Sequence, residues 1–303
     1  AKHLGLKRLA YSRRKALHLM AAIVTLGPNS AWHRVRLGVD STARNALRVT
    51  SYQNRQGKRS HAMTYDWKAL AIFLAVLFAV GVVGRFLVFR VPDLKALHDK
   101  NTELDVIRKA ELKEAWVVES GKKVGGALNA VFALGVLPFI MTLQPVPVWR
   151  YAVDVVAILM IYDFYYYLTH RFAFHGVGWL KRVHGVHHQA LNPVAIDSFY
   201  VHPVETAIGI MLFFGGIVTW ALLLGPIHVS SIILCYLAFV YINTFNHIHF
   251  DLNKFPYRML HHAVAKHHVH HIHMRMGNFA TLTMFYDWLF GTLDKDMRVK
   301  KQT

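Results

Sequence analysis

Hydrophobic positions along the chain gather into long, almost uncharged runs separated by polar segments. The five runs are residues 69–89, 124–143, 151–168, 206–224 and 227–246. A helix needs about 20 apolar residues to cross the hydrocarbon core of a bilayer. Buried helices of a large soluble protein are the alternative interpretation, and so many runs in one chain disfavour it. The pattern therefore predicts an all-α, multi-pass membrane bundle with about four or five spans.

The composition agrees with a membrane protein, since 54% of the 303 residues are hydrophobic and 17% are charged. The single cysteine, Cys235, lies inside an apolar run and is expected to pack as a small apolar side chain. One cysteine excludes an intramolecular disulfide and a zinc site built from thiolates.

The formal net charge of +18 is concentrated at one end of the chain. Residues 1–62 carry thirteen Lys and Arg and one acid, Asp40, and they show no sustained hydrophobic periodicity. Met63 directly precedes the first apolar run and has the position of a natural start. We therefore expect residues 1–62 to be a disordered leader or no part of the natural protein. A lipid-binding basic tail, a transit-type extension and a nucleic-acid arm are the alternatives.

Sixteen of the 21 histidines lie within residues 170–273. All but His228, which is expected at the tip of a hairpin on the opposite side, form two groups that each follow an apolar run. The two runs between the groups are joined by a Gly-Pro dipeptide and predict a transmembrane hairpin. Two crossings return the chain to the side it left, so both groups face one compartment and can share a site. The same reasoning places the charged segment 90–123 on this side. Lys181 and Arg182 also lie there, and an excess of positive charge indicates the cytoplasm.

Two histidine triplets repeat one spacing. They are His184, His187 and His188, and His267, His270 and His271. Residues at i, i+3 and i+4 lie on one face of a helix, so the three imidazoles of a triplet can point in one direction. Imidazole ligands suit iron, copper, zinc and nickel. A zinc site is saturated by three or four protein ligands, whereas the histidines available here are enough for two metal ions.

Four short segments carry a more specific pattern: HRFAFH (170–175), HGVHH (184–188), NTFNH (243–247) and HHVHH (267–271). They resemble the histidine boxes of the fatty acid hydroxylase/sterol desaturase superfamily, whose members are membrane di-iron oxygenases. YDFYYYLTHR (162–171), HPVE (202–205) and residues 277–293 support the resemblance. It covers the chain from about residue 150 to residue 293 in the order of the family.

The resemblance implies an oxidoreductase, a monooxygenase that uses two iron ions and O₂ to attack an unactivated C–H bond of a lipid. It implies electrons from NAD(P)H through a separate carrier, a ferredoxin or cytochrome b5 with its reductase. Nine histidines are carried over as metal ligands: His170, His175, His184, His187, His188, His247, His267, His270 and His271. The spacing of the first box and the HPVE segment favour hydroxylation of a fatty acyl, sterol or related lipid. Desaturation is the alternative.

Three polar residues are expected close to the metal ions. Asp163 is expected to accept a hydrogen bond from a ligand imidazole, and Glu205 from His202 or a neighbouring ligand. The alternative is that either acid pairs with Arg171 or Lys181. Asn243 stands where the family often has a histidine, and it is expected to position a water or to pack as a polar helix residue. His170 and His175 would point about 140° apart on an α-helix, so a helix end or a kink is expected between them. Five further histidines are expected outside the ligand set: His249, His261, His262, His268 and His273.

The chain is expected to divide into the leader 1–62, a first span with an amphipathic charged linker at 63–123, and a catalytic membrane domain at 124–303. A histidine-rich metal transporter is disfavoured, because the triplets follow the spans instead of lying at mid-membrane. A nucleic-acid binder would rest on the leader alone, and no nucleic-acid partner is expected. The compact chain favours a bacterial inner membrane over the endoplasmic reticulum, with the site facing the cytoplasm.

Overall fold

The structure is a computed structural model that describes residues 64–272 and 277–294. Helices make up nearly all of its secondary structure. The expected leader at 1–62 and the extra histidine His273 lie outside the described residues.

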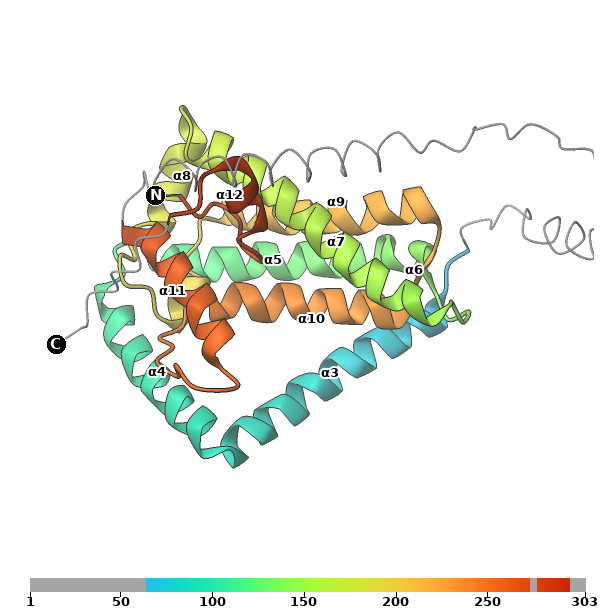
Figure 1. Cartoon of the computed structure of the whole chain (residues 1–303), viewed down its shortest axis with the longest axis horizontal. Coiled ribbons are helices and arrows are strands. Elements are labelled where there is room, and N and C mark those ends of the chain that lie inside the picture. Colours follow the sequence, from blue (N-terminus) through green and yellow to red (C-terminus); the bar gives the residue numbers. More distant parts are fainter. Residues whose placement is uncertain (1–63, 273–276, 295–303) are drawn as a thin grey trace, which may run out of the picture. The chain divides into compact units, whose positions relative to one another are not determined.

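The elements follow one another as a series of helices with two very short strands (Figure 1). They are α3 (Trp67–Arg90), α4 (Pro92–Glu111), α5 (Trp116–Gly135), α6 (Leu137–Ile140), β1 (Met141–Thr142), α7 (Val148–Thr169), the π-helix η1 (His170–Phe174), α8 (Trp179–His187), the 3-10 helix η2 (Ala195–Ser198), α9 (Pro203–Leu224), β2 (Ile227–His228), α10 (Val229–Phe245), α11 (Arg258–Ile272) and α12 (Phe285–Phe290).

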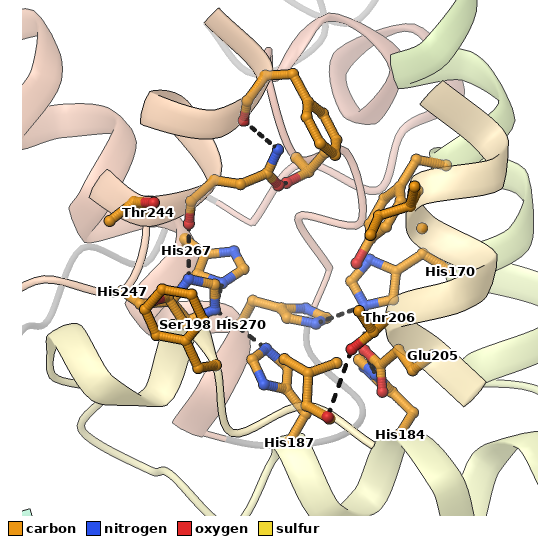
Figure 2. Close-up of a pocket in the computed structure, with 18 of the residues that line it drawn as sticks. His170, His184, His187, Ser198, Glu205, Thr206, Thr244, His247, His267 and His270 are labelled. Atoms are coloured by element: carbon orange, nitrogen blue, oxygen red, sulfur yellow. Dashed lines mark hydrogen bonds and ion pairs between the residues drawn. The ribbon is translucent and has the colours of Figure 1, made fainter. Parts of the chain in front are cut away.

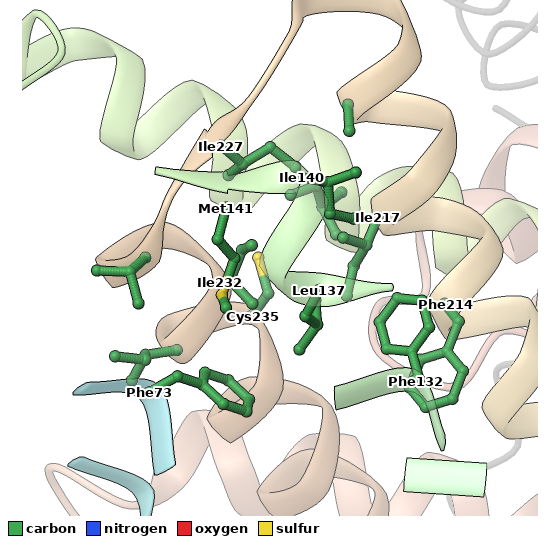
Figure 3. Packing of buried hydrophobic residues seen from close by; sticks show 14 of the residues in the cluster. Phe73, Phe132, Leu137, Ile140, Met141, Phe214, Ile217, Ile227, Ile232 and Cys235 are labelled. Atoms are coloured by element: carbon green, nitrogen blue, oxygen red, sulfur yellow. The ribbon is translucent and has the colours of Figure 1, made fainter. Parts of the chain in front are cut away.

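The body of the bundle is formed by long helices that pack side by side. α7 packs against both α9 and α10, α5 packs against α9, and α3 packs against α10. Their apolar side chains meet in one core, which Figure 3 shows around Leu137, Ile217 and Ile232. Cys235 is fully buried in this core, as expected for a small apolar side chain. The predicted all-α membrane bundle is confirmed.

Three of the described helices are long and apolar enough to cross a bilayer: α3, α7 with its continuation to Phe174, and α9. α10 is also apolar but has only 17 residues. On α3, large apolar side chains such as Phe78 and Phe86 are exposed. A contiguous exposed apolar surface is unfavourable in water, so lipid is the environment that fits this helix. The chain is therefore built as a membrane protein.

The predicted span at 124–143 is wrong in its boundaries. α5 begins earlier, at Trp116, and ends at Gly135, and the separate short helix α6 follows. Pro138 explains the break, because its ring collides with the carbonyl four residues earlier in a continuous helix and it has no N–H to donate. The first turn of α5 contains Glu119 and lies outside the apolar run.

A short parallel bridge joins the two interhelical turns at one end of the bundle. Met141 pairs with Ile227, and Thr142 pairs with His228. Gly225 has a φ of +82°, a backbone conformation open to glycine, and the chain reverses there between α9 and α10. The predicted hairpin is therefore present, and it returns the chain to the end at which α9 begins (Figure 1).

α4 lies beside the histidine-rich segments at that other end, as predicted for residues 90–123. The Asn101 carboxamide donates to the His249 carbonyl and accepts from the His249 N–H, both at 2.9 Å. Lys254, which precedes α11, forms an ion pair of 2.7 Å with Asp93. These contacts attach α4, which connects α3 to α5, to segments that follow α10.

One ion pair inside the bundle offers a test of the packing between α7 and α9. The fully buried Asp154 carboxylate accepts from Arg150 Nε at 2.6 Å and from Trp220 Nε1 at 2.7 Å. We expect Asp154→Ala to lower the free energy of unfolding by about 3–5 kcal/mol, because it leaves a largely buried guanidinium unpaired. Thermal unfolding in detergent measures the change.

The control is Lys123→Ala, which removes the exposed ion pair between Lys123 and Glu119. Exposed pairs contribute little, so this variant should stay within about 1 kcal/mol of the wild type. Equal losses in the two variants would contradict the importance of the buried Asp154.

Candidate metal centre

A π-helical turn brings the first two histidines together. The His175 N–H donates to the His170 carbonyl at 2.9 Å, a bond across five residues instead of the four of an α-helix. The wider turn cancels most of the angle that would separate His170 and His175 on an α-helix. Of the expected helix end or kink, the helix end is present: α7 finishes in this π-helical turn, and the chain bends at residues 175–178 before α8 begins.

Five imidazoles form a first cluster: His170, His175, His184, His188 and His270. His170 begins η1 and His175 follows it. His184 lies in α8 and His188 directly follows that helix, while His270 lies in α11. His170 Nε2 lies 3.0 Å from His184 Nε2, 3.2 Å from His175 Nε2 and 3.1 Å from His270 Nε2. His188 Nε2 lies 3.0 Å from His184 Nε2. One nitrogen of each ring thus points to a common centre.

Four imidazoles form a second cluster: His187, His247, His267 and His271. The Nε2 atom of His247 lies 3.1 Å from that of His187 and 3.0 Å from that of His267. His271 Nε2 lies 3.1 Å from His267 Nε2. Each sequence triplet is therefore divided, since His187 leaves its triplet for the second cluster and His270 leaves its triplet for the first.

The outer nitrogens of most of these rings contact acceptors. In the first cluster, His170 Nδ1 lies 2.7 Å from the Phe279 carbonyl and His270 Nδ1 lies 2.8 Å from the Gly277 carbonyl. In the second, three backbone carbonyls act alike: Asn243 O to His247 at 2.9 Å, Ala190 O to His271 at 3.0 Å and Tyr200 O to His187 at 3.3 Å. A carbonyl only accepts, so each of these rings carries its proton on Nδ1.

The inner nitrogens therefore present lone pairs to one another. Lone pairs about 3 Å apart repel unless a cation lies between them. At metal–nitrogen distances of about 2.0–2.1 Å, two ligands at a right angle are about 3.0 Å apart, which matches the observed spacing. The donor set fits a metal ion at each cluster, with imidazole as the donor that suits iron, copper, zinc and nickel.

Burial keeps these imidazoles in the form that binds metals. Removal from water lowers the pKa of His187 and of His247 to about 4. The same cause holds the pKa values of His267, His270 and His271 well below the usual range. At neutral pH these rings are uncharged, so a metal ion does not have to displace a proton from them.

Glu205 lies beside His184 of the first cluster. Its Oε1 atom accepts from His184 Nδ1 at 2.7 Å, and its carboxylate is almost fully buried. Asn243 is engaged through its side chain as well as its carbonyl: it donates to the Phe239 carbonyl at 2.7 Å and accepts from Thr281 Oγ1 at 2.9 Å. Both side chains lie against the cavity described below.

The expectation for Asp163 is corrected. Within the described residues its carboxylate makes hydrogen bonds to Thr281, Leu282 and Thr283 and none to an imidazole. Three backbone N–H groups and one hydroxyl converge on it at 2.7–3.1 Å. Asp163 therefore holds the loop 277–283, whose carbonyls in turn accept from His170 and His270, and it acts on these imidazoles through the loop instead of directly.

Asp287 has a similar role that the sequence did not reveal. Its fully buried carboxylate accepts from the N–H groups of Phe279 and Ala280 at 2.8 and 2.7 Å, and from Thr292 Oγ1 at 2.7 Å. The DWLFGT segment that contains Asp287 lies apart from the histidine boxes in the sequence. An acid at the start of a short apolar helix was the available signal, since such an acid needs buried donors.

A cavity of about 170 Å³ adjoins both clusters. His170 and His184 lie on one side of it and His247 and His267 on the other (Figure 2). The rest of its wall comes mainly from α7, α9 and α10 and from the segment after η2: Tyr162, Tyr166, Ser198, Phe199, Val201, Thr206, Gly209, Ile210, Phe239 and Thr244. The cavity therefore joins the apolar bundle to the histidines.

Residues 155–292 match the family model described as fatty acid hydroxylase. We refer to residues 155–292 as the hydroxylase domain, after the family model that they match. This hydroxylase domain contains all nine histidines of the two clusters.

Two curated relatives illustrate what the hydroxylase domain is similar to. A very-long-chain aldehyde decarbonylase of Oryza sativa is 32% identical over 163 residues, which are 52% of this chain and 58% of the relative. A methylsterol monooxygenase of Arabidopsis thaliana is 30% identical over 160 residues, 51% of this chain and 57% of the relative. The chain thus spans little more than half the length of these relatives. No solved structure matches it.

The extra histidines of the hydroxylase domain lie outside both clusters. His261 Nδ1 contacts the Phe250 carbonyl at 2.9 Å, and His249 Nε2 lies 3.7 Å from an Asp251 oxygen. His262 is exposed, whereas His268 is partly buried. None of these four is among the nine clustered imidazoles of the described residues.

The π-turn depends on Gly176, which gives the first prediction for the site. A Cβ atom at this position would collide with the Phe172 carbonyl. We expect Gly176→Ala to displace His175 from the first cluster and to lower its metal affinity about 10- to 100-fold. Metal titration of the metal-free protein measures this effect. Gly126→Ala, at an open position in α5, is the control. An equal loss of metal affinity in this variant would refute the role of Gly176 in the π-turn.

Asp287 gives the second prediction. Asp287→Ala releases the N–H groups of the 277–283 loop, so the carbonyls that orient His170 and His270 lose their support. We expect the metal dissociation constant of the first cluster to rise about 10- to 100-fold, and that of the second cluster to change less. Retained affinity at the first cluster in a folded Asp287→Ala protein would show that the loop does not depend on this carboxylate.

Proposed function

We propose that the chain is a membrane-bound, O₂-dependent di-iron oxygenase that hydroxylates a C–H bond of a lipid. The observation that carries this proposal is the pair of buried, all-imidazole clusters that adjoin one cavity at the end of an apolar bundle. Clusters of five and four imidazoles exceed what one zinc ion takes. Two iron ions held by these residues would supply the redox chemistry that activates O₂.

The chain's own residues supply orientation and the exclusion of water. Ile210 and Phe239 give the cavity an apolar wall against which a hydrocarbon chain or ring system can pack. Tyr166 and Thr206 place hydroxyl groups on the same wall. Because the wall is formed by helices of the membrane bundle, a lipid is the substrate class that fits it. A fatty acyl, a sterol or a related lipid is proposed, and the relatives' names make sterols the first class to test.

Hydroxylation is proposed ahead of desaturation because of the first-box spacing and the HPVE segment. One of the relatives is named an aldehyde decarbonylase, so a lipid aldehyde is a second candidate substrate. A metal transporter is disfavoured, since the clusters lie where the apolar helices end and not at their middle.

The electron supply and the location belong to the same proposal. Electrons are proposed to come from NAD(P)H through a separate ferredoxin or cytochrome b5 with its reductase. Lys181 and Arg182 lie in α8 at the histidine end and favour a cytoplasmic site. A bacterial inner membrane is proposed over the endoplasmic reticulum.

Metal content and product analysis test the function together. Detergent-purified protein is analysed for metals by plasma mass spectrometry and is then supplied with a reductant, a sterol and fatty acyl mixture, and ¹⁸O₂. We expect about two iron ions per chain and a lipid alcohol that carries one ¹⁸O atom, because each cluster binds one ion and O₂ is the oxygen source.

Paired variants separate the clusters. His188→Ala with His270→Ala should remove the first ion, and His247→Ala with His271→Ala should remove the second. The exposed His262 lies outside both clusters, so His262→Ala is the control and should retain both ions and the product. Wild-type protein without metal, or with zinc and no labelled product, would overturn the proposal.

A further inference from the structure

α4 lies outside the hydroxylase domain in sequence but reaches its interior. The match to the family begins at residue 155, whereas α4 covers Pro92–Glu111. The helix is mostly polar, and most of its side chains are exposed. Arg108 is an exception, since only 18% of its side chain is exposed.

Arg108 pairs with a buried acid in the segment between α8 and α9. Its Nε atom donates to Asp197 Oδ1 at 2.9 Å, and the Asp197 side chain is fully buried. The second Asp197 oxygen accepts from the Val194 N–H at 3.0 Å, which closes the turn that contains η2. Asp105, one helical turn before Arg108, accepts from the Ile196 N–H at 2.7 Å. α4 therefore holds this turn at two points.

The same turn leads directly to a residue that orients the second cluster. The fully buried Tyr200 follows η2, and the Arg108 guanidinium lies 5.8 Å from the centre of its ring. The Tyr200 hydroxyl donates to Gln189 at 2.9 Å, which fixes the two ends of the segment to each other. The Tyr200 carbonyl accepts from His187. The carbonyl of Ala190, the residue after Gln189, accepts from His271.

The two clusters are thus supported by different parts of the chain. Loop carbonyls at 277 and 279 and the Glu205 carboxylate support the first cluster. The segment 189–200 supplies acceptors to two of the four imidazoles of the second cluster. At 3.3 Å, the bond from His187 to Tyr200 is at the long end for a hydrogen bond, so a small shift of the segment breaks it.

We propose that Arg108 is a positioning residue for the second metal site: its ion pair with Asp197 holds the segment 189–200, whose carbonyls orient His187 and His271. The inference rests on the proposed function, in that the clusters bind metal ions. It extends the functional unit beyond the hydroxylase domain to α4. Arg108 itself touches neither cluster and takes no part in the chemistry.

Anaerobic titration of the metal-free full-length protein with Fe(II) tests the proposal. The wild type should show two binding sites. Arg108→Ala should weaken the second about 10- to 100-fold and leave the first within about twofold, because only the second depends on the segment 189–200. Arg108→Lys, which keeps the positive charge, should recover part of the loss. Equal weakening of both sites, or no weakening, would overturn the proposal.

The matched control is Lys95→Ala on the same helix. Lys95 pairs with Asp99 at 2.6 Å, but about half of each side chain is exposed, so the loss of this pair should change neither affinity. If Arg108→Ala does not fold, Asp197→Asn takes its place, because the amide keeps the shape and one acceptor of the carboxylate.

A second measurement does not require metal. Amide hydrogen exchange in metal-free protein should become faster at residues 194–201 in Arg108→Ala and should stay unchanged at residues 277–283. If the wild type binds no metal, the proposed function fails, whereas this comparison still tests the contact between α4 and the segment. Unchanged exchange at 194–201 would reject the role of Arg108.

Discussion

Most imidazoles of the two clusters have partners on both of their nitrogens, and this arrangement organises the histidine end of the bundle. The buried His188 Nδ1 is the exception, with no hydrogen-bond partner among the described residues. The inner nitrogens converge at 3.0–3.2 Å, so their lone pairs call for a cation. The outer nitrogens have to donate, and inside the protein an unpaired donor is costly. Acceptors must therefore stand behind the rings at fixed positions, and most of those found are backbone carbonyls.

Four of the five carbonyls that accept from these imidazoles lie in loops, and the fifth, that of Asn243, lies in the last turn of α10. In both places no further turn of a helix uses the carbonyl, so loops and helix ends border the site. The loop 277–283 and the segment 189–200 both leave their carbonyls free for imidazoles. Such loops need their own support, and buried carboxylates supply it. Asp163 and Asp287 gather the N–H groups of the first loop, while Asp197 closes the turn of the second.

The sequence predicted those features that depend on a single residue type or on the length of an apolar run. Apolar runs predicted the bundle and the hairpin, and the nine histidines carried over from the family are the ones that cluster. The division into five and four, which separates His187 from its triplet, depends on how α8 and α11 cross and has no local signal. The structural roles of Asp163 and Asp287 depend on a loop that joins them only after folding.

The π-turn after α7 changes how many residues can separate the two histidines of the first box. An α-helix would bring two ligands onto one face with three residues between them, whereas the wider turn does so with four, as for His170 and His175. The extra residue is accommodated within the single wider turn that ends the helix. Boxes of either length can thus present the same pair of imidazoles.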